Sequence, residues 1–416
     1  MNAAGPGPAG TAHDSPLPAA PARPDFGALL RAFLPEHLRT AVVPPAHRRI
    51  LGQLARCGTG ELGHVVYGCR ACGEEHHVPR GCGNRHCPQC QGRLARAWLE
   101  RQQAALLPVP YFHVVFTLPH ALRPLAAAYP AEVYKLLFDA AAQTLLRVTG
   151  ERLGGVPGIT AVLHTWGQQL GLHPHLHCIV TGGALAADGQ WHAGRSSGYL
   201  FPVKVLGAIF RGKFLAGLTA LKGRGGIDPP RGGWRGLWRT LAPQKRWVVF
   251  AQRPFGGPEQ VLAYLSNYTH RVAISARRIL GWDEAARTVT FRYRDYADHS
   301  RVKACTLDAD EFLRRFRQHF LPRGFTKIRH YGILANHARS RLVAEARTAL
   351  TDAHASAPPA PAAPPSPARE PPRCPHCGDT RLHVRGLLRP DGRFIAVRAA
   401  RVASADEIPA AIRAPP

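Results

Sequence analysis

Two short patterns in this chain place residue types that can carry out chemistry at spacings that let them act together. His175 and His177 flank Leu176. In an extended strand residues i and i+2 point to the same face, so both imidazoles can reach one metal ion while Leu176 packs on the opposite face. Tyr264 and Tyr268 are four residues apart, a spacing that on a helix brings two phenols to one site.

This combination suits the cleavage of a phosphodiester by a hydroxyl nucleophile. Such a reaction needs a cation beside a non-bridging oxygen, a nucleophile opposite the leaving 3′ oxygen, and basic groups that hold the strand. Mg²⁺ or Mn²⁺ on two imidazoles and a further polar ligand supplies the cation, and a tyrosine phosphodiester conserves bond energy for later strand joining. Each pattern also has a structural explanation, because His-x-His occurs by chance in strands and tyrosines at this spacing are often partly buried helix residues.

The chain is strongly basic. It has 54 Lys and Arg residues against 27 Asp and Glu, a formal net charge of +27 over 416 residues. A folded protein with this charge is most simply explained by a polyanionic partner, so we expect nucleic acid. A GC-rich genome is an alternative source for part of the arginine excess. The hydrophobic content of 45% indicates a globular protein.

Neither membrane nor secretion signals are expected. The sequence contains no apolar run of the roughly eighteen residues that a membrane span requires, and its Ala/Pro/Gly-rich start lacks the basic beginning and apolar centre of a secretion signal. We therefore expect a protein of the bacterial cytosol, associated with the nucleoid. In that compartment ten cysteines are more consistent with metal ligands or isolated thiols than with disulfides.

The cysteines predict structural zinc. Cys69-Arg-Ala-Cys72 and Cys87-Pro-Gln-Cys90 are typical of the two knuckles of a zinc ribbon, which hold four thiolates about 2.3 Å from a tetrahedral Zn²⁺. Other residues nearby can bind a second ion or replace one of these four, namely Cys57, His64, His76, His77, Cys82 and His86. The later pair Cys374 and Cys377 is half of another knuckle. It is either a remnant in a decayed carboxy-terminal segment or takes ligands from elsewhere, with His376 and His383 as weak candidates.

Apolar periodicity predicts strands that alternate with helices along the chain. Strands are expected at residues 111–118, 159–166, 175–180, 246–251, 273–274 and 289–293. Helices are expected at residues 25–33, 93–105, 131–148, 203–221, 258–268 and 307–316. Antiparallel strands interrupted by helices indicate an α+β fold rather than a doubly wound sheet.

Several of these segments, in the same order, resemble the HUH two-tyrosine transposases of the insertion-sequence-ninety-one family. The resemblance spans roughly residues 25 to 345. It is carried by Asn84-Arg85-His86-Cys87, Phe116-Thr117-Leu118, Trp166-Gly167-Gln168-Gln169, His173-Pro174-His175-Leu176-His177 and Tyr264-Leu265-Ser266-Asn267-Tyr268-Thr269-His270-Arg271. It continues in Glu311-Phe312, Leu321-Pro322 and Ile328-Arg329-His330-Tyr331-Gly332.

Composition and the resemblance together predict a domain order. Residues 1–24 form a disordered tail, 25–107 a small zinc-ribbon-like DNA-binding domain, and 108–345 an antiparallel-sheet HUH catalytic domain with flanking helices. A Pro/Ala linker at 346–372 and a short tail with a Cys-x-x-Cys pair at 373–416 follow.

The resemblance also implies a function, that of a rolling-circle transposase. Such an enzyme cleaves single-stranded DNA at the ends of the mobile element, forms a 5′-phosphotyrosine intermediate and transfers the strand to target DNA. His175 and His177 would hold the metal, and Tyr264 and Tyr268 would be the nucleophiles.

Other site residues are less directly indicated. A hairpin can return Gln168 beside the histidine pair as a third ligand, since a neutral amide oxygen suits Mg²⁺; His164 and His173 are its rivals. Arg271, Arg277 and Arg278 follow the tyrosines closely enough to grip the scissile strand, although each could be a solvated side chain. The alternatives to a transposase are a non-enzymatic zinc-ribbon DNA-binding protein, and a plasmid replication initiator or relaxase that uses the same HUH chemistry.

Overall fold

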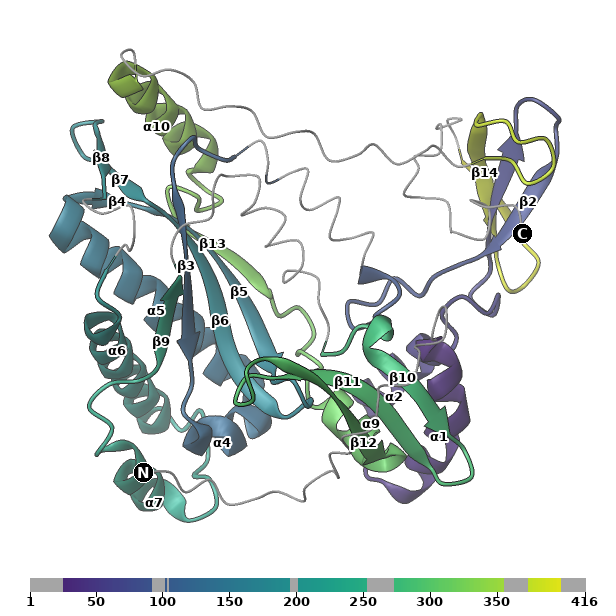
Figure 1. Ribbon diagram of the computed structural model, residues 1–416, viewed down its shortest axis with the longest axis horizontal. Helices are drawn as coiled ribbons and strands as arrows, with labels where there is room; N and C mark the ends of the chain where they lie inside the picture. The colour runs from purple at the N-terminus through teal and green to yellow at the C-terminus, as the bar shows by residue number, and fades with distance from the viewer. Residues whose placement is uncertain are drawn as a thin grey trace. The chain divides into compact units, whose positions relative to one another are not determined.

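The computed structural model describes residues 25–91, 102, 105–194, 201–252, 273–354 and 373–397 (Figure 1). The chain divides into two compact units, each assembled from separate stretches of sequence. The cysteine unit comprises residues 1–96, 270–317 and 362–416, and the sheet unit comprises residues 97–269 and 318–361.

A five-stranded antiparallel sheet forms the centre of the sheet unit, with the strand order β13-β5-β6-β3-β9. Its strands are β3 (Tyr111–Thr117), β5 (Gly158–Trp166), β6 (Leu172–Thr181), β9 (Val249–Gln252) and β13 (Ile328–Gly332). A smaller sheet of β4 (Gly155–Val156), β7 (Gly183–Ala186) and β8 (Trp191–Ala193) follows the end of β6.

The two faces of the central sheet bury different groups of apolar residues. Leu176, Cys178 and Val180 of β6 belong to the large core, which they share with helices α5 (Pro130–Leu153) and α6 (Val203–Gly223). Both helices lie on one side of the sheet in Figure 1. Because successive strand residues point to opposite faces, His177 and Ile179 project from the other side. There Ile179 packs with residues of α10 (Arg339–His354).

Short helices complete the large core of the sheet unit. They are η1 (His120–Leu122), α4 (Arg123–Ala128) and α7 (Gly233–Leu241). The long helix α5 presents apolar residues at helical spacing, among them Val133, Leu137 and Phe138, all of which are buried. It ends at Gly154, whose left-handed backbone (φ 66°) lets its N–H bond to the carbonyl oxygen of Gly150.

The described residues of the cysteine unit form two antiparallel sheets and three helices. One sheet has the order β15-β14-β1-β2, and the other has the order β10-β11-β12. Their strands are β1 (His64–Cys69), β2 (Glu75–Pro79), β10 (Ile279–Asp283), β11 (Thr288–Asp295), β12 (Arg301–Asp308), β14 (Leu382–Leu388) and β15 (Phe394–Ala396). The helices are α1 (Phe26–Thr40), α2 (Pro45–Ala55) and α9 (Ala309–Arg317), with the 3₁₀ turn η2 at Ala276–Arg278.

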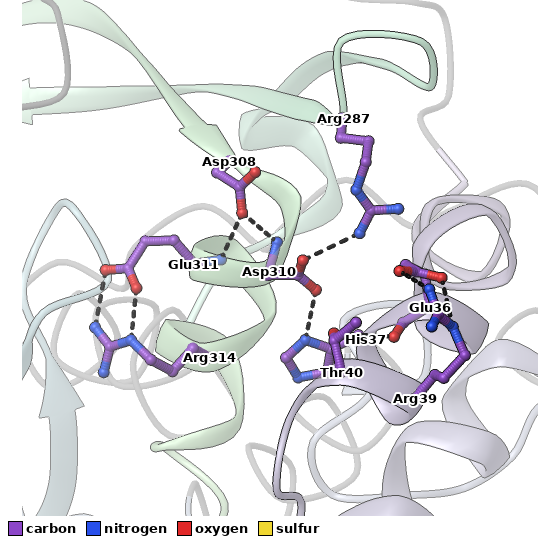
Figure 2. Close-up of polar contacts among 9 residues, drawn as sticks. All are labelled: Glu36, His37, Arg39, Thr40, Arg287, Asp308, Asp310, Glu311 and Arg314. Carbon is purple, nitrogen blue, oxygen red and sulfur yellow. Dashed lines mark hydrogen bonds and ion pairs between the residues drawn. The ribbon is translucent and has the colours of Figure 1, made fainter.

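Helix α9 is joined to helix α1 by a shared carboxylate (Figure 2). Asp308 caps α9, since its Oδ1 accepts bonds from the backbone N–H groups of Asp310 (2.8 Å) and Glu311 (3.2 Å). The carboxylate of Asp310 then accepts bonds from Nδ1 of His37 (2.8 Å) and Nη2 of Arg287 (3.1 Å). Burial alone would raise the pKa of Asp310, but these two donors lower it below its usual value.

The predicted α+β class, with antiparallel sheets and flanking helices, is confirmed. The expected strands near residues 111–118, 159–166, 175–180, 246–251 and 289–293 are present, as are the helices near 25–33, 131–148, 203–221 and 307–316. Ala273 and Ile274 are buried but form a bend, so the strand expected there is wrong. The helix expected at 258–268 lies outside the described residues, as does nearly all of that at 93–105. Within the described part of the chain, no helix is long and apolar enough to cross a bilayer.

Candidate metal centre and cysteine clusters

Three histidines from two neighbouring strands form one cluster in the sheet unit. His164 of β5 lies directly opposite His175 of β6, and Val162 lies opposite His177, so the side chains of all four residues share one face. The potential ligand atoms of His164, His175 and His177 all lie within 4.8 Å of one another. His164 and His177 are buried, with 3% and 8% of their surface exposed, whereas His175 is half-buried. We call these three residues the histidine cluster.

A hydrogen bond sets the tautomer of His175 on β6, and the bond at His177 allows the same tautomer there. Nδ1 of His175 lies 2.6 Å from the carbonyl oxygen of His173, which can only accept, so Nδ1 carries the proton and Nε2 keeps its lone pair. Nδ1 of His177 lies 2.8 Å from Nε2 of His113 on β3, and the two rings are parallel. A proton on Nδ1 of His177 donated to His113 likewise leaves Nε2 of His177 available to a metal.

The electrostatic environment keeps these imidazoles neutral. Burial lowers the pKa of His175 to about 4, and burial together with the neighbouring histidines holds the pKa of His177 well below its usual value. A metal ligand must be deprotonated, so protons compete less with a cation here than at an exposed histidine. The cluster therefore fits a divalent cation with three nitrogen ligands and coordination positions left for oxygen.

The third position of the cluster is occupied by a residue that the sequence analysis ranked second. His164 lies beside His175 and His177, whereas Gln168, the favoured third ligand, lies in the turn between β5 and β6. The physical reason is the hairpin register, because pairing of the two strands puts His164 across from His175. The other rival, His173, instead accepts a bond at Nδ1 from Nη2 of Arg123 (3.1 Å).

Aromatic and basic side chains surround the histidine cluster. The ring of Trp166 stacks on that of His164, with centroids 4.4 Å apart, and Nζ of Lys327 lies 5.1 Å from the centroid of the Trp166 ring. With Arg123 beside His173, two cationic side chains lie close to the cluster or its flanking residues. An anionic ligand such as a phosphodiester would therefore meet positive charge here even before a metal ion is counted.

The structure describes only two of the five tyrosines and arginines predicted to act on DNA. Tyr264, Tyr268 and Arg271 lie outside the described residues. Arg277 is exposed on η2 of the cysteine unit. Arg278 is half-buried; its Nε donates to the backbone oxygen of Arg292 (2.9 Å), and its guanidinium lies over the Phe291 ring. The described contacts of Arg278 thus attach it to β11, so part of its bonding capacity is already used within the protein.

Eight cysteines form two separate clusters of four in the cysteine unit. The first cysteine cluster is Cys57, Cys82, Cys87 and Cys90, and the second is Cys69, Cys72, Cys374 and Cys377. The sequence-based grouping of Cys69 and Cys72 with Cys87 and Cys90 is therefore corrected. The physical reason is that the fold inserts β14 beside β1, which brings Cys374 and Cys377 to the knuckle at Cys69 and Cys72.

Sulfur spacing within the first cysteine cluster suits a tetrahedral ion. Sγ of Cys57 lies 3.6 Å from Sγ of Cys90 and 3.6 Å from that of Cys87, and Cys82 lies 3.8 Å from Cys90. Bonds of about 2.3 Å to zinc give sulfur–sulfur edges of roughly 3.8 Å in a regular tetrahedron, whereas a disulfide would need about 2.05 Å. His86, a possible ligand by sequence, is not part of this cluster; its backbone N–H donates to Oδ1 of Asn84.

Comparisons with known proteins define the class to which these features belong. A family model described as "Putative transposase" matches residues 158–341, which include the whole histidine cluster. A model described as "Transposase zinc-binding domain" matches residues 29–118, which include the first cysteine cluster. The protein is thus of the class of transposases that carry a zinc-binding domain.

Individual relatives place it more narrowly. "Putative transposase y4qJ" of Sinorhizobium fredii is 44% identical over 318 residues, which cover 73% of this chain and 78% of that protein. The transposase for insertion sequence element IS801 of Pseudomonas savastanoi pv. phaseolicola is 29% identical over 344 residues, 78% of this chain and 80% of that protein. The chain belongs to the IS91-type transposase family. Among solved structures, the conjugative relaxase TrwC in complex with mutant oriT DNA matches 26% of this chain and 44% of its own, at 19% identity and a TM-score of 0.21.

Family membership confirms the coarse functional predictions. The protein is a DNA transposase, hence a DNA-cleaving enzyme, and DNA is its partner. The zinc-binding domain and the cysteine clusters support structural Zn²⁺. Sequence reasoning did not single out His113, and it ranked His164 below Gln168. The missing signals were the pairing of β3 with β6 for His113 and the register of the β5–β6 hairpin for His164.

Proposed function

We propose that this transposase cleaves and rejoins single-stranded DNA through a 5′-phosphotyrosine formed on Tyr264 or Tyr268, with a divalent cation held by His164, His175 and His177, as a step of rolling-circle transposition. The histidine cluster is the observation that carries the proposal. Three imidazoles presented together, with the pKa of His175 and that of His177 lowered, are typical of a metal site. The proposal adds the chemistry of strand cleavage to the family assignment.

The donor set narrows the choice of ion. The cation would be Mg²⁺ or Mn²⁺, which when bound neutralises charge on a phosphate oxygen at the scissile bond. Three nitrogen ligands suit Mn²⁺ better than Mg²⁺, because Mg²⁺ prefers oxygen and Mn²⁺ lies on the series in which affinity for nitrogen ligands rises. We therefore expect the cluster to bind Mn²⁺ more tightly than Mg²⁺.

In the proposed reaction a tyrosine acts as the nucleophile and basic side chains attract the DNA. A tyrosine phenol loses its proton to solvent, its oxygen forms a bond to phosphorus, and the P–O3′ bond breaks so that the departing 3′ oxygen takes up a proton. A 3′ hydroxyl can later attack the phosphotyrosine, which restores a phosphodiester and releases the phenol. Lys327 and Arg123, near the cluster, would attract the phosphate backbone.

A covalent-adduct assay tests the nucleophiles. Single-stranded oligonucleotides tiled across the ends of the element that carries this gene are mixed with the full chain and Mn²⁺, and the products are separated under denaturing conditions. We expect a protein–DNA adduct that is absent with chelator and absent in the Tyr264→Phe, Tyr268→Phe double variant. Tyr296→Phe, an exposed tyrosine in the cysteine unit, is the matched control and should keep the adduct. An adduct that persists in the double variant would remove both tyrosines from the mechanism.

A second pair of variants tests the metal ligands. His164→Ala should abolish adduct formation at low Mn²⁺ and raise the Mn²⁺ concentration needed for half-maximal cleavage. Gln168→Ala, a change in the turn of the same hairpin, should leave that concentration nearly unchanged. The opposite ranking of the two variants would restore Gln168 as the third ligand.

A further inference from the structure

We infer that the second cysteine cluster is a separate Zn²⁺ site that fastens the carboxy-terminal segment of the chain to its amino-terminal domain. The cluster joins Cys69 and Cys72 of the zinc-binding domain to Cys374 and Cys377, which lie beyond both matched family regions. Four thiolates in a closed tetrahedral set are the donor chemistry of a structural zinc ion.

Distances within the second cysteine cluster match this chemistry. Sγ of Cys69 lies 3.6 Å from Sγ of Cys377, and Sγ of Cys72 lies 3.8 Å from that of Cys374. These are close to the roughly 3.8 Å edge of a tetrahedral zinc–thiolate centre and far longer than the sulfur–sulfur bond of about 2.05 Å in a disulfide. Each knuckle contributes one buried sulfur, Cys69 or Cys374, and one exposed cysteine, Cys72 or Cys377.

The two knuckles have the same backbone construction. Each reads Cys-x-x-Cys-Gly, and the glycines, Gly73 and Gly378, have φ values of 79° and 73°. Their N–H groups donate to the carbonyl oxygens of Cys69 (3.0 Å) and Cys374 (2.8 Å), which closes each turn. A residue with a Cβ would be strained at this φ, so glycine lets each turn bring its two thiols to one side.

A further side chain lies beside the sulfurs of the second cysteine cluster. Nε2 of His76 lies 3.2 Å from Sγ of Cys374. With a proton on Nε2, this imidazole would donate to a zinc-bound thiolate, which is a stronger acceptor than a neutral thiol.

The surrounding sheet shows that the tail is built into the domain. Strand β14 pairs with β1 from Leu388 opposite His64 to Leu382 opposite Cys69, so β14 covers an edge that β1 would otherwise expose. Leu382 is buried with Tyr67 and Val78 in one small apolar cluster. Arg385 of the tail also forms an ion pair with Glu75 of β2. The tail therefore adds strand pairing, apolar contact and charge complementarity to the shared sulfurs.

Metal counting on the full-length protein tests the inference. Zinc per chain is measured by plasma mass spectrometry and by native mass spectrometry after purification under reducing conditions. We expect two zinc ions in the wild type and one in the Cys374→Ser, Cys377→Ser double variant. His376→Ala lies in the same knuckle on an exposed position and should keep two. One ion in the wild type, or two in the double-serine variant, would overturn the inference.

A conservative variant covers the possibility that the serine changes impair folding. Cys377→His keeps a zinc-binding side chain at an exposed position and should retain two ions. After replacement of zinc by Co²⁺, we expect the visible absorption of this variant to shift relative to the wild type, because one sulfur ligand has become nitrogen. An unchanged spectrum would exclude Cys377 from the coordination sphere. Neither measurement depends on DNA cleavage, so they separate this inference from the proposed tyrosine chemistry.

Discussion

The contact between His113 and His177 makes a quantitative prediction about the metal site. Nε2 of His113 lies 2.8 Å from Nδ1 of His177, and the two residues are 2% and 8% exposed. In His113→Phe the ring is kept but the acceptor is lost, so Nδ1–H of His177 remains buried without this partner. Leaving such a group unsatisfied costs about 1–3 kcal/mol.

Loss of the His113 acceptor should also weaken Mn²⁺ binding by His177. The hydrogen bond to His113 becomes stronger when His177 donates its electrons to a cation, and it fixes the orientation of the imidazole. If the full 1–3 kcal/mol appears in binding, the Kd for Mn²⁺ rises by roughly 5- to 150-fold. Loss of an outer partner of a metal-bound histidine typically weakens binding by about 10- to 100-fold, which agrees with that range.

The assay measures free Mn²⁺ by electron paramagnetic resonance during titration of the zinc-loaded protein. His330→Phe is the matched control, since His330 also lies on the central sheet and bonds to a neighbouring strand, through Oγ1 of Thr160 (3.0 Å). We expect the control to keep the wild-type Kd and both variants to keep the wild-type zinc content. If His113→Phe binds Mn²⁺ as tightly as the wild type, the proposed role of the His113–His177 bond is refuted.

Three further predictions concern stability and metal removal. Burial lowers the pKa of His319 to about 4, so the folded state resists its protonation; the resulting stability is complete above pH 6.5 and is lost as the pH falls toward 4. His319→Gln should therefore reduce the acid-dependent loss of unfolding free energy by about 3 kcal/mol, measured by urea titration at several pH values. In thermal unfolding, Asp310→Asn should destabilise the cysteine unit by about 1 kcal/mol, a value reduced because the carboxylate is 37% exposed. The control Glu36→Gln should have no measurable effect on unfolding. Zinc chelation should make the cysteines of both clusters reactive toward a thiol reagent while Cys178 and Cys305 stay protected by burial; early reaction of these two would indicate that the chain had unfolded instead.

Local sequence patterns predicted most of the sheet unit. The alternation around His175 and His177 gave the strand and its two faces, because a period of two residues is a local property of an extended backbone. Helix α5 was expected at residues 131–148 and spans Pro130–Leu153, since its apolar spacing is equally local. Arrangements that depend on pairing between distant segments, such as the addition of β13 to the edge of β5, left no comparable periodicity.

The third metal ligand shows how far a contact between residues on the two strands of one hairpin can be predicted from the sequence. Strands β5 and β6 are joined by a turn in which Leu170 has φ 63°, and their register shifts by one residue at an irregularity between His164 and Trp166. Counting evenly outward from Trp166 opposite Leu172 would put His164 opposite Pro174, whereas the shift puts it opposite His175. Gly167 and Gly171 mark the turn in the sequence, but no residue type marks the shift, so the partner of His175 could not be predicted from the turn alone.

The cysteines show why ligand partners are harder to predict than ligands. Each Cys-x-x-Cys turn is local and was identified, but nearness in sequence wrongly favoured joining the Cys69 and Cys87 knuckles. A knuckle can complete its site with any pair that the fold brings within reach, and strand pairing between β1 and β14 makes that choice here. The glycine that follows Cys72 and Cys377, but not Cys90, is a local trace of the correct match. Gly73 and Gly378 close equivalent turns in the two knuckles that β1 and β14 bring together, and the first cysteine cluster completes its set with Cys57 and Cys82.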